Sequence, residues 1–265
     1  MKVCLAILFA CLIFVTACTP SAVAPAEGKL KILTEVYPPY NFVDKNMNVT
    51  GQSTEIVQAI LNQLDVTAQI EVVSLSEGLE LLQKGPAMVM YSLNRTPARE
   101  KLFKWVGPIG QYEQVFYARK GSSIQVNRLE DAKQVEKIGV YKGDAGNQYL
   151  ASQGFTNLDE SQTDVEALKK LIDGEVQLWL GNKEGLEITA KEAGVSLDEL
   201  VLLPTIVIEA NLYIAFSKDI PDGTVTKWQE ALDVIKQQED IDGKTLYDKI
   251  LAKYSDPGYL QSLLR

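Results

Sequence analysis

The sequence contains no histidine, so the Ser-His-Asp and Cys-His classes of catalyst and the usual imidazole metal sites are excluded. Its three cysteines, Cys4, Cys11 and Cys18, all lie near the N-terminus, so no internal disulfide is expected in the mature protein. Basic residues are outnumbered, with 26 lysines and arginines against 35 acidic residues and a net charge of -9. An acidic chain without basic runs is unsuited to nucleic acid or to electrostatic docking on anionic lipid.

Long apolar runs are confined to the N-terminus, where Lys2 precedes the stretch CLAILFACLIFVTA. This stretch is too short for a comfortable membrane span and predicts a targeting segment. It ends in Val-Thr-Ala-Cys18, which resembles a lipobox, while Ala26 offers a second cleavage position. We favour lipidation of Cys18 because the cysteine falls at the end of the apolar run. Residues 1–18 are then a signal peptide and residues 19–29 a tether, and the product lies outside the inner membrane, joined to it only by lipid.

Strand and helix patterns alternate along the rest of the chain, of which 46% is hydrophobic overall. Residues 29–35 predict a strand, Ser53 a helix cap, residues 67–74 a strand, and Ser74 the cap of a helix that ends at Gly85. This alternation is typical of βαβ units around a mostly parallel sheet. A second unit of similar size follows, so the sequence predicts two lobes.

A carboxylate receptor is predicted near the end of the first unit. The buried strand AMVM leads into Tyr91, Ser92 and Asn94, and Thr96-Pro97 predicts the start of a helix with Arg99 in its first turn. Helix N-termini attract anions, and arginine binds a carboxylate through two parallel hydrogen bonds. The alternative is a surface arginine that forms a salt bridge on its own helix.

The second unit carries polar groups at the ends of its own strands. Residues 137–141 predict a strand that enters a glycine-rich turn at 143–146, and residues 175–180 a strand that ends at Gly181-Asn182. The turn lacks the Lys-Ser/Thr of a phosphate loop. Open α/β sheets bind ligands beyond the carboxyl ends of their strands, so these groups belong to the candidate site.

The order and spacing of several motifs resemble the bacterial extracellular solute-binding proteins, family 3, which supply polar amino acids to ABC transporters. The resemblance runs from about Lys31 to Tyr254. The matching motifs are Tyr37-Pro38-Pro39-Tyr40 with Phe42, Gly51, Leu79-x-x-Leu82-x-x-Gly85, Ser92-Leu93-x-x-Thr96-Pro97-x-Arg99-Glu100, the Phe103 region, Ile138-Gly139-Val140-x-x-Gly143, Leu168-x-x-Leu171-x-x-Gly174-x-Val176 and Asp242-Gly243-x-x-Leu246-Tyr247.

The resemblance implies an α/β protein with the two-lobed type II periplasmic-binding-protein fold. Each lobe is expected to hold a mixed, mostly parallel sheet flanked by helices, with two hinge strands near residues 114–116 and 210–212. The implied division is residues 30–113 plus 212–256 for the first lobe, 114–211 for the second and 257–265 for a C-terminal tail. The implied protein is a monomer without cofactor, metal or enzymatic activity that delivers a small carboxylate ligand, an amino acid or a derivative, to a permease.

The resemblance also implies roles for individual residues. Arg99 would bind the α-carboxylate of the ligand, Ser92 and Asn94 would add hydrogen bonds, and Tyr37 would wall the ligand side chain. The turn at 143–145 would close from the second lobe. The full set of expected ligand-binding residues is Tyr37, Tyr91, Ser92, Asn94, Arg99, Asp144, Ala145 and Asn182.

Three departures from the family pattern mark a divergent member. Asn182 stands where the family generally has an aspartate that pairs with the ligand's ammonium. Asp144 stands where threonine is frequent, and either supplies that charge or only caps the following helix. The usual Gly-x-Val-Asp segments have changed to Gly85-Pro86-Ala87 and Gly174-Glu175-Val176-Gln177.

Two other functions are compatible with the same fold. A few relatives, such as periplasmic cyclohexadienyl dehydratases, perform chemistry in the cleft, for which Asp144, Glu209 and Glu35 are the available acids or bases. A sensory protein that binds a solute for signalling is the other alternative.

Overall fold

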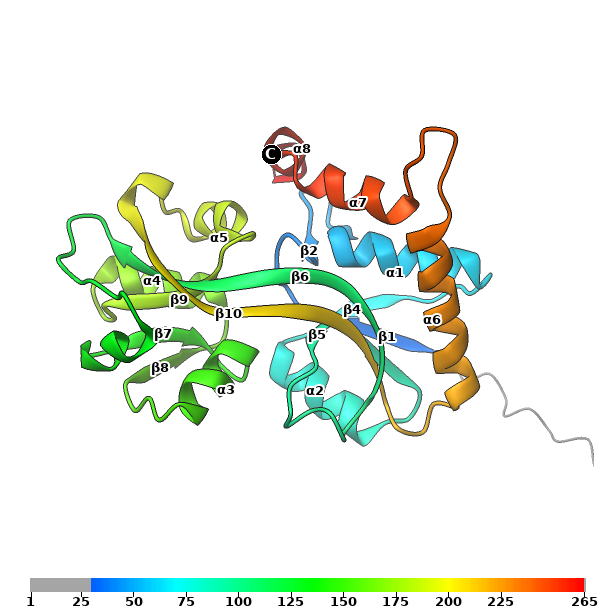
Figure 1. Ribbon diagram of the computed structural model, residues 1–265, viewed down its shortest axis with the longest axis horizontal. Helices are drawn as coiled ribbons and strands as arrows, with labels where there is room; N and C mark the ends of the chain where they lie inside the picture. Colours follow the sequence, from blue (N-terminus) through cyan, green and yellow to red (C-terminus); the bar gives the residue numbers. More distant parts are fainter. Residues whose placement is uncertain (1–29, 265) are drawn as a thin grey trace, which may run out of the picture.

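Two lobes joined by two long strands make up the computed structural model, which describes residues 30–264 (Figure 1). The signal peptide, Cys18 and the tether predicted at residues 19–29 lie outside the described residues. The first lobe contains β1 (Lys31–Thr34), β2 (Phe42–Val43), β3 (Val49–Thr50), α1 (Gln52–Gln63), β4 (Ile70–Val72), α2 (Leu75–Lys84), β5 (Met88–Asn94), α6 (Asp222–Gln237), α7 (Leu246–Tyr254) and α8 (Pro257–Leu264). The second contains η1 (Leu129–Gln134), β7 (Ile138–Tyr141), α3 (Ala145–Ser152), β8 (Leu158–Ser161), α4 (Asp164–Asp173), β9 (Leu178–Asn182), α5 (Leu186–Ala193) and η2 (Leu197–Glu199).

The joining strands, β6 (Lys104–Arg119) and β10 (Leu200–Phe216), pair antiparallel from end to end. They lie in the middle of an eight-stranded sheet of order β4-β1-β5-β10-β6-β9-β7-β8. Inside each lobe the neighbouring strands are parallel, β1 with β4 and β5, and β7 with β8 and β9. Both lobes are therefore mixed, mostly parallel sheets that share the same two long strands. The hinge strand expected near residues 210–212 is part of the longer strand β10.

Helices cover the sheet with apolar faces that follow the sequence periodicity. Ile56, Val57 and Ile60 of α1 are completely buried in the core of the first lobe. Trp228 of α6 packs edge-to-face on Phe216 of β10, with ring centroids 5.1 Å apart. Residues 257–264, expected to be a tail, form α8 instead, because the apolar side chains of this segment, including the buried Leu260, pack on the same core.

The helix expected from Thr96-Pro97 is not formed. Residues 97–102 make consecutive turns, in which the amides of Arg99 and Glu100 both donate to the carbonyl of Thr96. The first turn of a helix is unfavourable because it fixes several residues for a single hydrogen bond. Since β6 begins at Lys104, too few residues remain to extend that turn into a stable helix.

Gly51, and not Ser53, is the N-cap of α1. Gly51 has φ 122°, and a Cβ at this position would collide with the carbonyl group of Tyr40. Only glycine adopts this conformation at no cost, so the cap lies two residues before the serine and the helix begins at Gln52. The cap predicted at Ser74 is confirmed, since its side chain accepts the amide of Glu77. Thr163 caps α4 in the same way by accepting the amide of Glu166.

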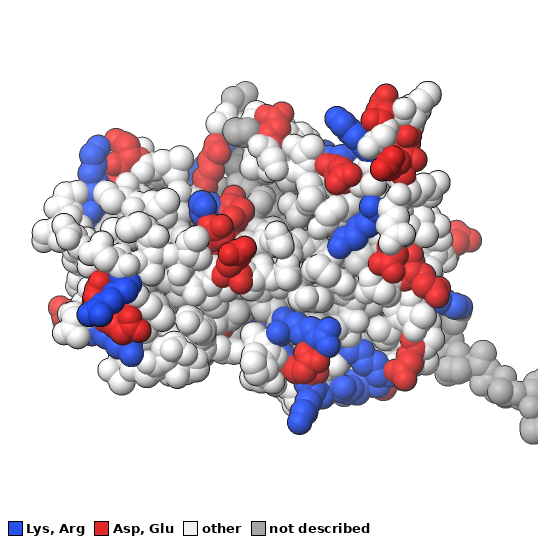
Figure 2. Space-filling view, viewed as in Figure 1, with Lys and Arg blue, Asp and Glu red and all other residues white. Residues whose placement is uncertain are grey.

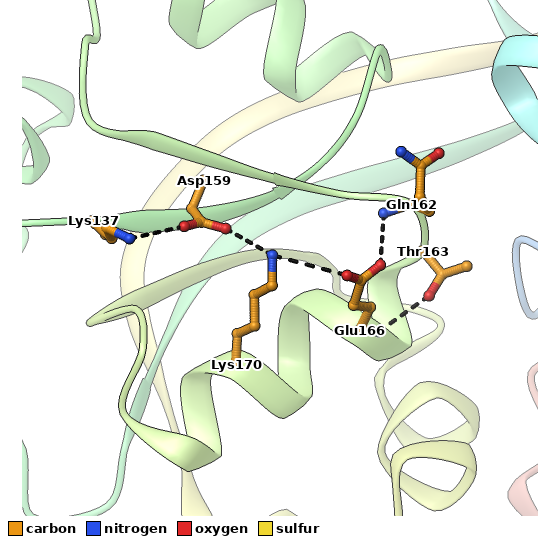
Figure 3. A network of polar contacts seen from close by, with 6 residues as sticks. All are labelled: Lys137, Asp159, Gln162, Thr163, Glu166 and Lys170. Carbon is orange, nitrogen blue, oxygen red and sulfur yellow. Dashed lines mark hydrogen bonds and ion pairs between the residues drawn. The ribbon is translucent and has the colours of Figure 1, made fainter.

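A polar network in the second lobe joins α4 to β7 and β8 (Figure 3). Asp159 of β8 accepts from Lys137 at 3.1 Å and from Lys170 of α4 at 2.8 Å. Glu166 accepts the amide of Gln162 and donates its own amide to Thr163. Exposed ion pairs contribute little individually, but this network orients the first turn of α4.

Charged side chains of both signs are interspersed on the face shown in Figure 2. Among residues 30–264, no helix is long and apolar enough to cross a membrane.

Trp228→Ala should lower the free energy of unfolding by about 3–5 kcal/mol, because it leaves a cavity against Phe216. Val234→Ala on the exposed side of the same helix is the control, with an expected change of about 0.5 kcal/mol. Denaturant unfolding measures both. Equal losses for the two variants would contradict this placement of α6.

Candidate functional site

A small enclosed cavity lies between the lobes, at the carboxyl ends of β1, β5 and β7. Its volume is about 10 Å³, room for no more than one water molecule. Five of the residues predicted for the site line it or border it: Tyr37, Ser92, Asn94, Arg99 and Asp144. The other lining residues are Glu35, Leu75, Leu93 and Tyr141.

Ser92 is turned toward the cavity by an irregularity in β5. Leu93 pairs with Tyr213 and Tyr91 with Ile214, so Ser92 is left without a partner between them. Its φ of 64° is uncommon for a residue other than glycine, and its buried hydroxyl has no hydrogen-bond partner. A bulge of this kind redirects a side chain at the edge of a functional site.

Tyr91 points away from the cavity into the core of the first lobe. It is completely buried, and its hydroxyl lies 2.8 Å from that of Thr54. Successive side chains of a strand face opposite sides, so Tyr91 lies on the core side of β5. It does not line the cavity.

Arg99 is buried between the lobes, only 4% exposed. One terminal nitrogen donates to the carbonyl of Gly143 at 2.8 Å and the other to that of Asn94 at 3.4 Å, while Nε has no partner. No carboxylate of residues 30–264 lies within ion-pair distance of its guanidinium, and burial lowers its pKa. The surface-arginine alternative is therefore wrong.

Glu35 lies beside Arg99 at the end of β1. The hydroxyl of Tyr141, from the second lobe, donates to its carboxylate at 2.6 Å. Burial raises the pKa of Glu35 to about 7, although the hydrogen bond from Tyr141 and the charge of Arg99 oppose the shift.

Asp144 both caps α3 and lines the cavity. One carboxylate oxygen accepts the amide of Asn147 and the other accepts from the side chain of Gln114, both at 2.6 Å. The prediction that Asp144 is an N-cap is confirmed. Burial raises the pKa of this carboxyl as well.

Ala145, the first residue of α3, borders a neighbouring groove instead of the cavity. This open groove of about 740 Å³ runs between the loop at residues 94–98, α3 and the middle of β10.

Asn182, in the second lobe, contacts the first lobe through its side-chain NH₂ group, a hydrogen-bond donor that an aspartate lacks. Its side-chain amide donates to the carbonyl of Pro38 at 2.8 Å, while its side-chain oxygen has no partner. The nearby Gly185 lies so close to Pro38 that a Cβ would collide with the same carbonyl. A carboxylate at position 182 would repel this oxygen, which explains asparagine here.

Tyr37 and Asn94 are held in place by contacts with the protein. Tyr37 stacks on Tyr40 and meets Tyr112 edge-on, with centroids 5.8 and 5.9 Å apart. Asn94 accepts from the hydroxyl of Tyr112 at 2.9 Å and donates to the carbonyl of Asn211 at 3.1 Å.

Tyr141 is the main site residue absent from the prediction, and Glu35 was considered only as a catalytic acid. Each lies at the carboxyl end of a predicted strand, so the rule that located Ser92 and Asn182 applied to them too. Asp164, at the start of α4, lies close enough to Asp144 and Glu35 for their charges to raise its pKa further, beyond the effect of burial.

Comparison with known proteins decides the family. The model of the bacterial extracellular solute-binding proteins, family 3, matches residues 30–256. The chain belongs to this family. Membership confirms the resemblance found in the sequence.

Two curated relatives match parts of this solute-binding chain. The amino-acid-binding protein AabA of Dichelobacter nodosus is 24% identical over 149 residues, 54% of this chain and 58% of AabA. A protein of Escherichia coli strain K12, provisionally named ABC transporter arginine-binding protein 2, is 24% identical over 129 residues, 48% of this chain and 51% of that protein. The chain thus spans a little over half the length of each.

Solved structures share the fold. A histidine kinase sensor domain with similarity to periplasmic binding proteins has a TM-score of 0.75 at 22% identity, covering 85% of this chain and 96% of that one. An ancestral arginine-binding protein bound to arginine has a TM-score of 0.72 at 24% identity, covering 86% and 98%. The two-lobed periplasmic-binding fold expected from the sequence is confirmed.

Glu35→Gln should change how the stability of this solute-binding protein depends on pH. The folded protein holds the proton of Glu35 up to about pH 7, whereas the ordinary value is 4.5. The free energy of unfolding therefore falls as the pH rises through this window, by up to about 3 kcal/mol from this group. Glutamine does not titrate, so the free energy of unfolding of the variant should decrease less than that of the parent over the same pH range.

Thermal or urea unfolding between pH 4 and 8 measures this dependence. Glu230→Gln, on the exposed side of α6, is the control and should retain the wild-type profile. An unchanged profile in Glu35→Gln would show that Glu35 is not the buried acid described.

Proposed function

We propose that the protein binds an amino acid between its lobes and delivers it to the permease of an ABC transporter. One observation carries the proposal, the burial of Arg99 between the lobes without a carboxylate partner. Glu35 and Asp144 act on Arg99 only through the electrostatic field, without a direct ion pair. A buried cation without a directly bonded counter-ion is costly, so an anion that hydrogen-bonds to Arg99 lowers the free energy strongly. A carboxylate suits a guanidinium best, because two parallel hydrogen bonds form.

The carboxylate of Asp144 is proposed to pair with the ligand's ammonium. Both its oxygens already accept hydrogen bonds from Asn147 and Gln114, which fix its position. A carboxylate can accept about four hydrogen bonds, so an ammonium can be added. Asn182, which occupies the family's usual ammonium position, uses its side-chain amide on Pro38 instead.

Ligand entry is proposed to separate the lobes by rotation about β6 and β10. Arg99–Gly143, Glu35–Tyr141 and Asn182–Pro38 all join the two lobes. The moving bodies are proposed to be residues 30–113 plus 212–256 and residues 114–211. Hinge closure around a ligand would then bury it in a site formed by both lobes. The names of the two curated relatives, which refer to amino-acid and arginine binding, support an amino-acid ligand.

Arg99→Ala should weaken binding of the amino acid by about ten- to a hundredfold or more, the loss expected for a hydrogen-bonded charge. Titration calorimetry with the amino acids that bind the parent protein measures the change. Arg95→Ala is the control, because Arg95 is exposed and paired with Glu100. Parent-like affinity in Arg99→Ala would rule out this carboxylate site.

The protein is proposed to act outside the inner membrane, anchored through a lipid on Cys18. Mass spectrometry of the membrane fraction should find residues 1–18 processed and Cys18 acylated, and Cys18→Ser should release the protein from the membrane. Cleavage after Ala26 in the parent protein would contradict the anchor.

A further inference from the structure

We propose that Tyr141 closes one end of the binding site, so that the protein accepts amino acids with short side chains and rejects arginine and lysine. This inference rests on the proposed function and specifies its ligand.

Tyr141 is the last residue of β7, and its side chain reaches from the second lobe to two groups of the first. Its hydroxyl donates to the carboxylate of Glu35 at 2.6 Å and accepts the amide of Leu75, the first residue of α2, at 3.3 Å. The ring is almost fully buried beside Leu75 and other apolar residues of the first lobe. The polar groups at this end of the cavity are therefore paired within the protein.

The remaining lining residues define where a ligand side chain lies. With the carboxylate on Arg99 and the ammonium on Asp144, the side chain is proposed to lie against Glu35, Leu75 and Tyr141, which share the cavity wall with Tyr37 and the end of β5. The cavity there is about 10 Å³, so a ligand gains room only by moving the lobes apart. With a short side chain bound, the lobes close again far enough for the hydrogen bonds of Tyr141 to re-form.

A long cationic side chain has to break these hydrogen bonds. Displacing the phenol would leave the amide of Leu75 buried without a partner, which costs free energy. A guanidinium or ammonium group would reach the carboxylate of Glu35 only by displacing the ring of Tyr141, which lies beside it. Arginine and lysine are thus rejected both by the volume of the Tyr141 ring and by the loss of its hydrogen bonds, whereas a short side chain meets neither cost.

The test compares Tyr141→Ala with Tyr141→Phe. The alanine variant removes the ring and leaves the carboxylate of Glu35 facing the enlarged site, so its affinity for arginine and lysine should rise about tenfold or more. The phenylalanine variant keeps the ring and loses only the hydroxyl, so it should gain little. Calorimetry with glycine, alanine, serine, lysine and arginine is performed on the parent and both variants, with thermal melts to establish that each is folded.

The parent protein should bind one or more of glycine, alanine and serine at least tenfold more tightly than arginine. Equal or tighter binding of arginine by the parent overturns the inference while leaving the proposed function intact. A folded Tyr141→Ala without any gain for arginine or lysine also overturns it; Tyr141→Leu replaces this variant if it does not fold. If the folded parent and both folded variants bind none of the five and no other amino acid, the proposed function fails and the inference falls with it.

Discussion

The end-to-end pairing of β6 and β10 is the constraint on which the rest of the structure depends. Because both strands belong to both lobes, the two parallel sheets are parts of one eight-stranded sheet. This arrangement turns the carboxyl ends of β1 and β5 toward that of β7, so side chains far apart in sequence meet between the lobes (Figure 1). The same two strands are the only described strands in which a hinge can lie, since all the others belong to a single lobe.

Charge balance is the second feature of the site. Arg99 is accompanied by three acids, Glu35, Asp144 and Asp164, whose pKa values are all raised, mainly by burial. Removing four ionisable groups from water is expensive unless charges are neutralised, and protonation of carboxyls is one way to achieve this. In the proposed function an amino-acid ligand supplies another, because its carboxylate would balance Arg99 and its ammonium would balance Asp144. The proposed ligand chemistry and the predicted pH dependence of stability therefore both follow from the burial of these ionisable groups.

Hydrogen bonds that are not ion pairs join the lobes at this charged centre. Backbone carbonyls of Gly143 and Pro38 accept from Arg99 and Asn182, and a phenol donates to Glu35. Such contacts stabilise a closed arrangement without requiring a second cation. Asn182 and Tyr141 belong to the second lobe and bond to the first. A substitution at either position would therefore also change how the two lobes pack together.

Local patterns are enough to predict the order of elements, the caps at Ser74 and Asp144, and the family, because these depend on neighbouring residues and on motif spacing. The rule that strand ends form the site also selected Ser92, Asn94, Arg99 and Asp144, and the family resemblance added Tyr37; all five meet at the cavity. Three features follow only from the packing of the whole chain: the turns after Pro97 replace a helix, a bulge in β5 turns Ser92 toward the cavity, and Tyr141 reaches Glu35. These outcomes depend on strand register and on contacts between distant segments, and no local pattern encodes either.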